Sequence, residues 1–335
     1  MPELIDPASL TPSPQSRRVL RVLRAASAGG RADRLATPRG VRVLRRASTM
    51  ALVSARRGRR DNHQPVRERT GDGWVEGEWV GGVPAPSTRI IYYLHGSGYV
   101  MCSPRTHRAF VGYLGHLCDR SAFTVRYRLA PEHRFPAAHD DAVNGYLWLL
   151  EQGFAAHDII VAGDSAGGHL AFALCGELRR RGLRQPAGVL AFSPLVDPTW
   201  KTAARDERAA HDPLVTAAVA HAITGLYTVG ADPSDPRLDV IRDVGADLAP
   251  MLIQAGSREI LAADARAYAA AQQAAGGRCE LQIWPGQIHV FQVAGRFLPE
   301  ARIAMRHVQR FVRDLDADAG VATKLPDPAD VAPPV

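Results

Sequence analysis

The pattern Gly163-Asp164-Ser165-Ala166-Gly167 places one serine among small residues. The apolar run 159–162 precedes it and a stretch of helical composition, 169–181, follows it, so the pattern stands where a strand turns sharply into a helix. Small neighbours let strand and helix approach closely and leave the hydroxyl of Ser165 accessible. A serine is a weak nucleophile unless a base lies beside it. The pattern therefore predicts nucleophilic catalysis if the chain also supplies a base, an acid and donors for a developing negative charge.

A small-residue loop upstream offers such donors. The strand-like run 89–94 leads into His95-Gly96-Ser97-Gly98. Loops of this kind present backbone N–H groups to the oxyanion that forms during acyl transfer. We expect the N–H groups of Gly96, Ser97 and Ala166 to form this oxyanion hole.

The base and the acid are expected downstream of the serine. His289 follows a strand-like run near the end of the chain, where a catalytic base is expected. The strand-like run 251–256 leads to two carboxylates, Glu259 and Asp264. We favour Glu259 as the acid, with Asp264 as its rival on the following helix, and set Asp212 aside because it precedes this strand. The order of nucleophile, acid and histidine is that of the α/β-hydrolases.

Four stretches together resemble the hormone-sensitive-lipase-like branch of the α/β-hydrolases, the family IV bacterial carboxylesterases. These stretches are His95–Gly98, Tyr127–Ala138, Gly163–Gly167 and His289–Phe291. The resemblance implies the α/β-hydrolase fold, with a mostly parallel central sheet, helices on both faces and a helical cap. It also implies a triad of Ser165, His289 and Glu259.

The chain departs from the family pattern at two points. Ser97 stands at a glycine position of the oxyanion motif, and its side chain narrows the allowed backbone angles. Glu259-Ile260-Leu261 stands where many relatives have Asp-x-Leu. Ser97 still has a backbone N–H donor, and the glutamate at 259 can orient a histidine. We therefore expect both the oxyanion hole and the triad to function.

These residues predict a serine carboxylesterase that hydrolyses short- to medium-chain acyl esters through an acyl-enzyme on Ser165. Two alternatives remain open. One is a non-catalytic receptor for a small ligand, like the plant hormone receptors that share this fold but lack the histidine. The other is an amidase or lactonase that uses the same triad. His289 argues against the receptor.

The sequence also indicates how the chain is divided. Alternating strand-like and helix-like runs predict one α/β-hydrolase catalytic domain over residues 61–316. Residues 197–230 interrupt this alternation, and we interpret them as part of a cap. Residues 1–60 form a basic N-terminal extension that we expect to add cap helices, and residues 317–335 are expected to be a flexible tail.

Positive charge is concentrated in the N-terminal extension. Residues 11–60 hold fourteen arginines and one acid, Asp33, whereas the whole chain has a net charge of only +7. The arginines of the stretch 17–24 alternate with Val and Leu, which predicts a basic amphipathic helix. Such a helix fits three roles: a cap over the acyl pocket, peripheral contact with an anionic membrane, or a solvated lead-in.

The remaining patterns limit partners and location. The four cysteines and twelve histidines show no metal-binding spacing, and no dinucleotide fingerprint stands out, so no cofactor and no metal are expected. We expect a small ester substrate and no nucleic acid, and enzymes of the resembling family are often homodimers through a sheet edge. No apolar run is long enough to span a membrane and no secretory leader is visible, which favours a cytoplasmic protein, with membrane association through residues 11–60 as an open alternative.

Overall fold

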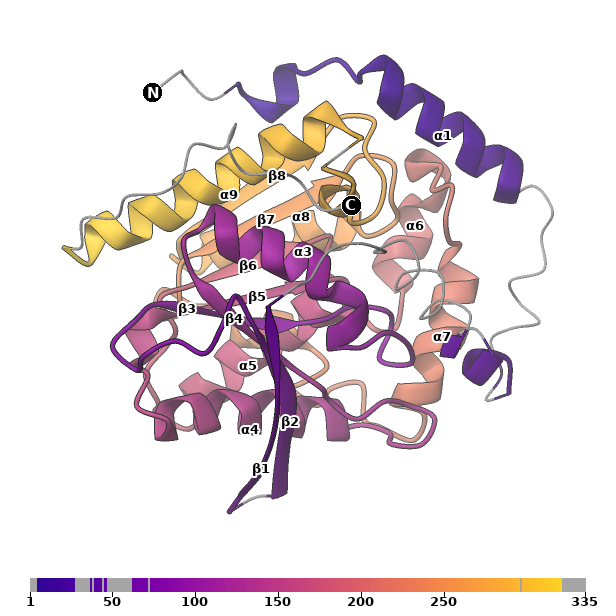
Figure 1. The fold of residues 1–335 in the computed structure, drawn as a ribbon. Helices are drawn as coiled ribbons and strands as arrows, with labels where there is room; N and C mark the ends of the chain where they lie inside the picture. The colour runs from indigo at the N-terminus through magenta and orange to yellow at the C-terminus, as the bar shows by residue number, and fades with distance from the viewer. Residues whose placement is uncertain are drawn as a thin grey trace.

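A single eight-stranded sheet organises the molecule (Figure 1). The computed structural model describes residues 5–27, 37, 39–43, 45–46, 62–71, 73–295 and 297–320. Its strands are β1 (His63–Thr70), β2 (Gly73–Val80), β3 (Ile90–Leu94), β4 (Ser121–Val125), β5 (Ile159–Asp164), β6 (Gly188–Phe192), β7 (Met251–Gly256) and β8 (Cys279–Trp284). They lie in the order β1-β2-β4-β3-β5-β6-β7-β8.

Helices connect and cover these strands. The α-helices are α1 (Pro14–Ser27), α3 (Pro104–Leu117), α4 (Ala137–Glu151), α5 (Ala166–Arg180), α6 (Lys201–Ala210), α7 (Ala217–Thr228), α8 (Ala262–Ala274) and α9 (Pro299–Asp318). Short 3₁₀ helices are η1 (Pro7–Ser9), η3 (Ala156–Asp158), η4 (Val240–Asp243) and η5 (Phe291–Ala294). Helices α3 and α9 pack on one face of the sheet, whereas α4, α5 and α8 pack on the other (Figure 1).

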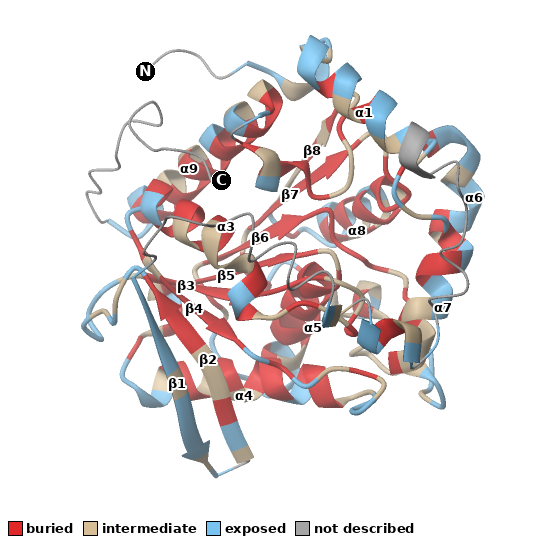
Figure 2. Cartoon of the chain, turned by 45° about the vertical axis from the view of Figure 1, so that its right-hand side comes forward, coloured by how far each residue is buried: buried red, intermediate tan, exposed pale blue. Residues whose placement is uncertain are grey.

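The sheet is parallel from β4 to β8, and β1 and β2 pair antiparallel at one edge. Strands β3, β5, β6 and β7 are fully buried, and their sequences are short, almost uninterrupted apolar runs (Figure 2). This pattern is typical of parallel strands that are covered by helices on both faces. In such sheets functional residues lie beyond the carboxyl ends of the strands, where the chain turns into the next helix.

The prediction of a mostly parallel α/β-hydrolase sheet is confirmed, but the hairpin of β1 and β2 was not expected. Strand β1 is almost wholly exposed and carries Pro65 among charged residues (Figure 2). Because β1 lies at the exposed edge of the sheet, it does not need an apolar face. Its sequence therefore lacks the alternation of apolar and polar residues that marks a half-buried strand.

The predicted domain bounds stay predictions, although parts of them can be compared with the structure. Helices α6 and α7 lie within residues 197–230, the segment interpreted as a cap. Within the basic extension, α1 covers the stretch predicted to be helical. Helix α9 continues to Asp318, and residues 321–335 of the predicted tail lie outside the described residues, as do 28–36 and 47–61.

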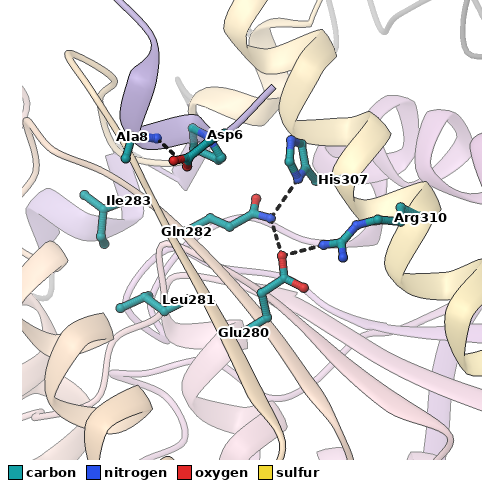
Figure 3. Close-up of a pocket in the computed structure, with 9 residues that line it drawn as sticks. Asp6, Ala8, Glu280, Leu281, Gln282, Ile283, His307 and Arg310 are labelled. Atoms are coloured by element: carbon teal, nitrogen blue, oxygen red, sulfur yellow. Dashed lines mark hydrogen bonds and ion pairs between the residues drawn. The ribbon is translucent and has the colours of Figure 1, made fainter. Parts of the chain in front are cut away.

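The N-terminal segment is fastened to β8 and α9. The backbone N–H of Ser13 donates to the carboxylate of Glu300 at 2.5 Å, and Nε2 of His307 lies 3.1 Å from the carbonyl oxygen of Ile5. A pocket of about 530 Å³ lies at this junction (Figure 3). Its polar side chains are engaged with one another, since Gln282 bonds both Glu280 and His307. None of the predicted site residues lines it, so we assign this network to anchoring the N-terminal segment.

Candidate active site

Ser165 sits in the sharp turn between β5 and α5 that the sequence predicts. Its backbone angles, φ 52° and ψ −119°, are strained for a residue with a side chain. Glycine is required two residues later, because a Cβ at Gly167 would overlap the carbonyl group of Leu94. The backbone of Ser165 is bonded on both sides: its N–H donates to Phe192 O at 2.9 Å, and its carbonyl accepts from Leu195 N at 3.0 Å. The end of β6 and the loop that follows it therefore hold this strained conformation in place.

His289 and Glu259 are joined directly. Nδ1 of His289 lies 2.6 Å from Oε2 of Glu259, a distance that fits an Nδ1–H donating to the carboxylate. The other oxygen of Glu259 accepts from the N–H of Gly256 at 2.6 Å. The Glu259 side chain is fully buried, whereas the imidazole is 23% exposed. The carboxylate is thus fixed in the interior. It orients the imidazole through Nδ1, which leaves Nε2 outside the hydrogen bond to Glu259.

Charge around the imidazole favours its protonated form. Burial of the ring works against a positive charge, but the hydrogen bond and the negative charge of Glu259 outweigh burial, and Asp212 and Asp164 add to them. The pKa of His289 is consequently raised above its usual value. A histidine held in this way accepts a proton readily.

Ser165 and His289 are connected through the segment that follows β6. Leu195 N donates to the carbonyl of Ser165, and two residues earlier the Ser193 hydroxyl accepts from Val290 N at 3.0 Å. Among the contacts of the described residues, no hydrogen bond joins Ser165 Oγ to His289. Catalytic hydrogen bonds are often long without substrate and shorten only in the complex.

Asp264, the rival acid, bonds the loop after β6, whereas His289 bonds Glu259. Its Oδ2 accepts from the backbone N–H groups of Val196 and Asp197, at 2.9 and 3.0 Å. Burial raises the pKa of Asp264 to about 7. The structure thus brings Glu259 to His289 and gives Asp264 a place in the loop after β6.

The three predicted oxyanion donors differ in their surroundings. The Gly96 N–H already donates to Oδ1 of Asp164 at 3.0 Å. The N–H groups of Ser97, Gly98 and Ala166 donate to no acceptor within the described ranges. Ala166 is the first residue of α5, so its N–H also lies at the positive end of that helix. Ser97 has a φ of 92°, an angle that favours glycine, and its hydroxyl donates to Cys102 Sγ at 2.8 Å.

Asp164 and His95 stabilise the loop Gly96–Gly98. Asp164 accepts from the Tyr93 hydroxyl at 2.7 Å as well as from Gly96 N. The His95 ring stacks on Tyr127, with ring centroids 4.2 Å apart. Burial lowers the pKa of His95 to about 3, so the ring is neutral and shapes the loop.

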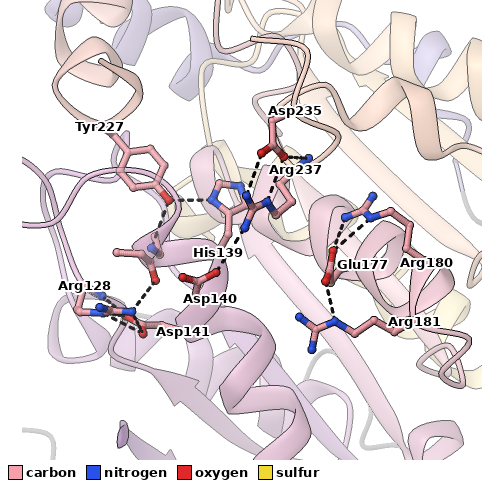
Figure 4. Close-up of polar contacts among 12 residues, drawn as sticks. Arg128, His139, Asp140, Asp141, Glu177, Arg180, Arg181, Tyr227, Asp235 and Arg237 are labelled. Atoms are coloured by element: carbon pink, nitrogen blue, oxygen red, sulfur yellow. Dashed lines mark hydrogen bonds and ion pairs between the residues drawn. The ribbon is translucent and has the colours of Figure 1, made fainter. Parts of the chain in front are cut away.

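The stretch Tyr127–Ala138 is hydrogen-bonded to residues of α4 and α7 (Figure 4). Arg128 forms a two-pronged bond to Asp141 in α4, at 2.8–3.0 Å. The N–H of Ala138 donates to the hydroxyl of Tyr227 in α7 at 3.2 Å, and the ring of the adjacent His139 lies 2.8 Å from the same hydroxyl. These contacts give this stretch a structural role.

Sequence reasoning missed two residues near the histidine. Asp212, which the sequence analysis set aside, lies between α6 and α7 and accepts from Ile260 N at 3.1 Å, directly beside Glu259. Ser193 contacts the residue after His289, as described above. Only the Asp-x-Leu pattern of Asp212 could have drawn attention to it, since both contacts join segments far apart in the sequence.

Among the described residues, no group of three or more His, Cys, Asp or Glu side chains is placed to hold a metal ion. No described helix combines the length and apolar character needed to cross a membrane. All four cysteines are free, and three of them are buried.

Known proteins are similar to this chain over the part that holds the candidate site. Residues 91–293 match the model of a family with the alpha/beta hydrolase fold. The carboxylesterase/phospholipase LipF of Mycobacterium tuberculosis is 35% identical over 243 residues, which cover 70% of this chain but 64% of LipF. An acetyl-hydrolase of Streptomyces hygroscopicus is 37% identical over 72% of this chain and 80% of its own length.

Solved structures agree with these matches. An esterase from the bacterial hormone-sensitive lipase family superposes with a TM-score of 0.78 and 32% identity, over 91% of this chain and 99% of that one. The structure of EstE5 gives a TM-score of 0.79 and 33% identity over the same shares of the two chains. With the fold, the sharp turn at Ser165 and these similarities in agreement, the chain belongs to the hormone-sensitive-lipase-like family of the alpha/beta hydrolase fold.

Proposed function

We propose that the protein is a serine carboxylesterase that hydrolyses short- to medium-chain acyl esters through an acyl-enzyme on Ser165. The observation that carries this proposal is the 2.6 Å bond between His289 and Glu259. The loop that holds His289 is linked to the strained turn of Ser165 through the segment after β6. A receptor needs no base oriented by a buried acid, so this pair favours the enzyme.

In the proposed reaction Ser165 Oγ attacks the ester carbonyl while His289 Nε2 takes the hydroxyl proton. Glu259 keeps the other proton on Nδ1 and stabilises the charged ring. The imidazolium then gives its proton to the leaving alcohol, and the acyl group remains on Ser165. Water repeats the sequence, with His289 as its base, and releases the acid.

The oxyanion is assigned to the N–H groups of Ser97, Gly98 and Ala166. Gly96 was predicted to be a donor, but its single N–H is directed at Asp164. We therefore assign Gly96 to holding the loop, and Gly98 takes its place in the proposal. Each donor of this kind contributes about 2.7–4 kcal/mol to transition-state stabilisation.

Substrate size is tested with p-nitrophenyl esters from C2 to C16. Relatives bear the names acetyl-hydrolase and ethyl acetate hydrolase, which supports small acyl groups. We expect kcat/KM to be greatest between C2 and C8 and to fall for longer chains. Matched p-nitroanilides and a lactone test the amidase and lactonase alternatives. A preference for C16 would contradict the esterase, and no turnover together with no labelling by a fluorophosphonate would favour the receptor.

We further propose that α1 places the enzyme at an anionic membrane surface. Its inner side is fixed near the site, because the Ser16 hydroxyl lies 3.1 Å from Nε2 of Gln287 and Leu20 is buried. Its outer side carries Arg17, Arg18, Arg21 and Arg24, all exposed. A cytoplasmic location and a homodimer stay predictions of the sequence.

Replacing Arg18, Arg21 and Arg24 by Gln should therefore weaken binding to vesicles with phosphatidylglycerol. Each basic residue near such a surface contributes about 1 kcal/mol, and salt should reduce binding further. Co-sedimentation with these vesicles measures the change, and neutral phosphatidylcholine vesicles should bind neither protein. Arg184, Arg266 and Arg306, exposed elsewhere, give a control with the same loss of charge. Equal sedimentation of both triple variants would remove the proposal.

A further inference from the structure

Three residues with unfavourable backbone angles meet at the candidate site. Ser165, Ser193 and Val290 have φ values of 52°, 48° and 50°. The left-handed region is costly for a β-branched residue in particular, so Val290 needs support from its surroundings. Val290 directly follows His289, and its backbone therefore sets where the imidazole lies.

Ser193 supplies that support. It is fully buried at the end of β6, and its N–H donates to Gln254 O in β7 at 2.6 Å. Its hydroxyl accepts from Val290 N at 3.0 Å, within the interior. A buried N–H left without an acceptor costs about 1–3 kcal/mol, so this bond favours the strained conformation over alternatives.

The segment that carries Ser193 also holds the nucleophile. Leu195 N donates to the carbonyl of Ser165 at 3.0 Å. Further along, Asp264 fixes Val196 and Asp197 by their N–H groups. One short segment, pinned at both ends, thus contacts the chain at the nucleophile and at the base.

We propose that Ser193 is a positioning residue that sets His289 relative to Ser165 through its hydroxyl. It touches neither substrate nor the reacting atoms, and acts by holding the backbone at Val290. This inference rests on the proposed function, because it assigns a role within the same esterase site.

The test removes the hydroxyl in two ways. Ser193→Ala keeps the Cβ, and Ser193→Gly suits the φ of 48° and avoids added strain. Both should lower kcat for p-nitrophenyl acetate by about tenfold to a hundredfold, because misplacement by 1 Å can cost 10²-fold. KM should change little, and the rate of fluorophosphonate labelling should fall by the same factor as kcat.

A matched control separates positioning from general destabilisation. Gln272 is also fully buried and holds a loop, at Gly245, but at the opposite end of the strands. Gln272→Ala should lower the melting temperature and leave kcat near that of the wild type. Wild-type kcat in both Ser193 variants would overturn the inference. If the wild type itself neither turns over esters nor reacts with the probe, the proposed function fails instead.

Coupling to Val290 gives a second readout. In a Val290→Gly background glycine adopts a positive φ without help, so Ser193→Ala should cost a smaller factor in kcat than in the wild type. The same factor in both backgrounds would overturn the route through Val290, whatever the effect of Ser193 alone.

Discussion

Ser165→Ala is expected to lower kcat for p-nitrophenyl butyrate about 10⁶-fold, the loss typical of removing a catalytic serine. The remaining rate should come only from the oxyanion donors and from substrate binding. Without Oγ no acyl-enzyme can form, so labelling by a fluorophosphonate should vanish as well. Steady-state kinetics and intact-mass spectrometry of the labelled protein measure both results.

The same substitution should leave the fold intact. The contacts of Ser165 described above are made by its backbone, which alanine retains. The melting temperature should therefore stay within a few degrees of the wild type, whereas loss of activity with unfolding would be uninformative about chemistry. Turnover at the wild-type rate in a folded Ser165→Ala protein would refute the esterase mechanism.

Glu259→Gln is expected to lower kcat about 10³- to 10⁴-fold. The amide oxygen of glutamine can still accept from Gly256 N, which turns the NH₂ group towards His289 Nδ1. Nδ1 must then accept, so the ring proton moves to Nε2, the atom that should take the proton of Ser165. The replacement keeps the size of the side chain and puts the wrong tautomer in place.

The pH profile of the residual activity adds a second measurement. His289 acts as a base only when neutral, so kcat/KM should rise with pH through the pKa of His289. Glu259 helps to raise that pKa, and removing its charge should move the rise to lower pH. A stopped assay between pH 4 and 9 would show the shift.

Asp264→Asn is the control for the choice of acid. Asparagine can still accept from Val196 and Asp197 through its oxygen, and the bond between Glu259 and His289 is untouched. We expect kcat and the position of the acidic limb to stay close to the wild type. A larger loss in Asp264→Asn than in Glu259→Gln would reverse the assignment of the acid.

Sequence predicted best what depends on local pattern. The bounds of β3 and β7 agree to within one residue with the strand-like runs at 89–94 and 251–256, because buried parallel strands need little else to define them. The turn at Ser165 was likewise visible from the small residues around it. Strand β1 was missed because its charged residues are exposed at the edge of the sheet and contribute no apolar pattern.

The parts of the site that depend on distant contacts could not be predicted. Nothing near Gly96 in the sequence shows that its N–H meets a carboxylate 68 residues away. The bond of Ser193 to Val290 spans 97 residues, and that of Asp212 to Ile260 spans 48. Motifs report residue types along the chain, whereas the hydrogen-bond partner of each group is decided only when the strands assemble.

The contact of Asp212 has a consequence for exchanging parts between enzymes. One oxygen of this carboxylate fastens the segment between α6 and α7 to the backbone beside the acid, and its charge also reaches the imidazole. A chimaera that takes residues 197–230 from another esterase would lose or gain this charge with the transplanted piece. Such a graft should therefore transfer part of the donor enzyme's pH dependence of activity together with its selectivity for acyl length.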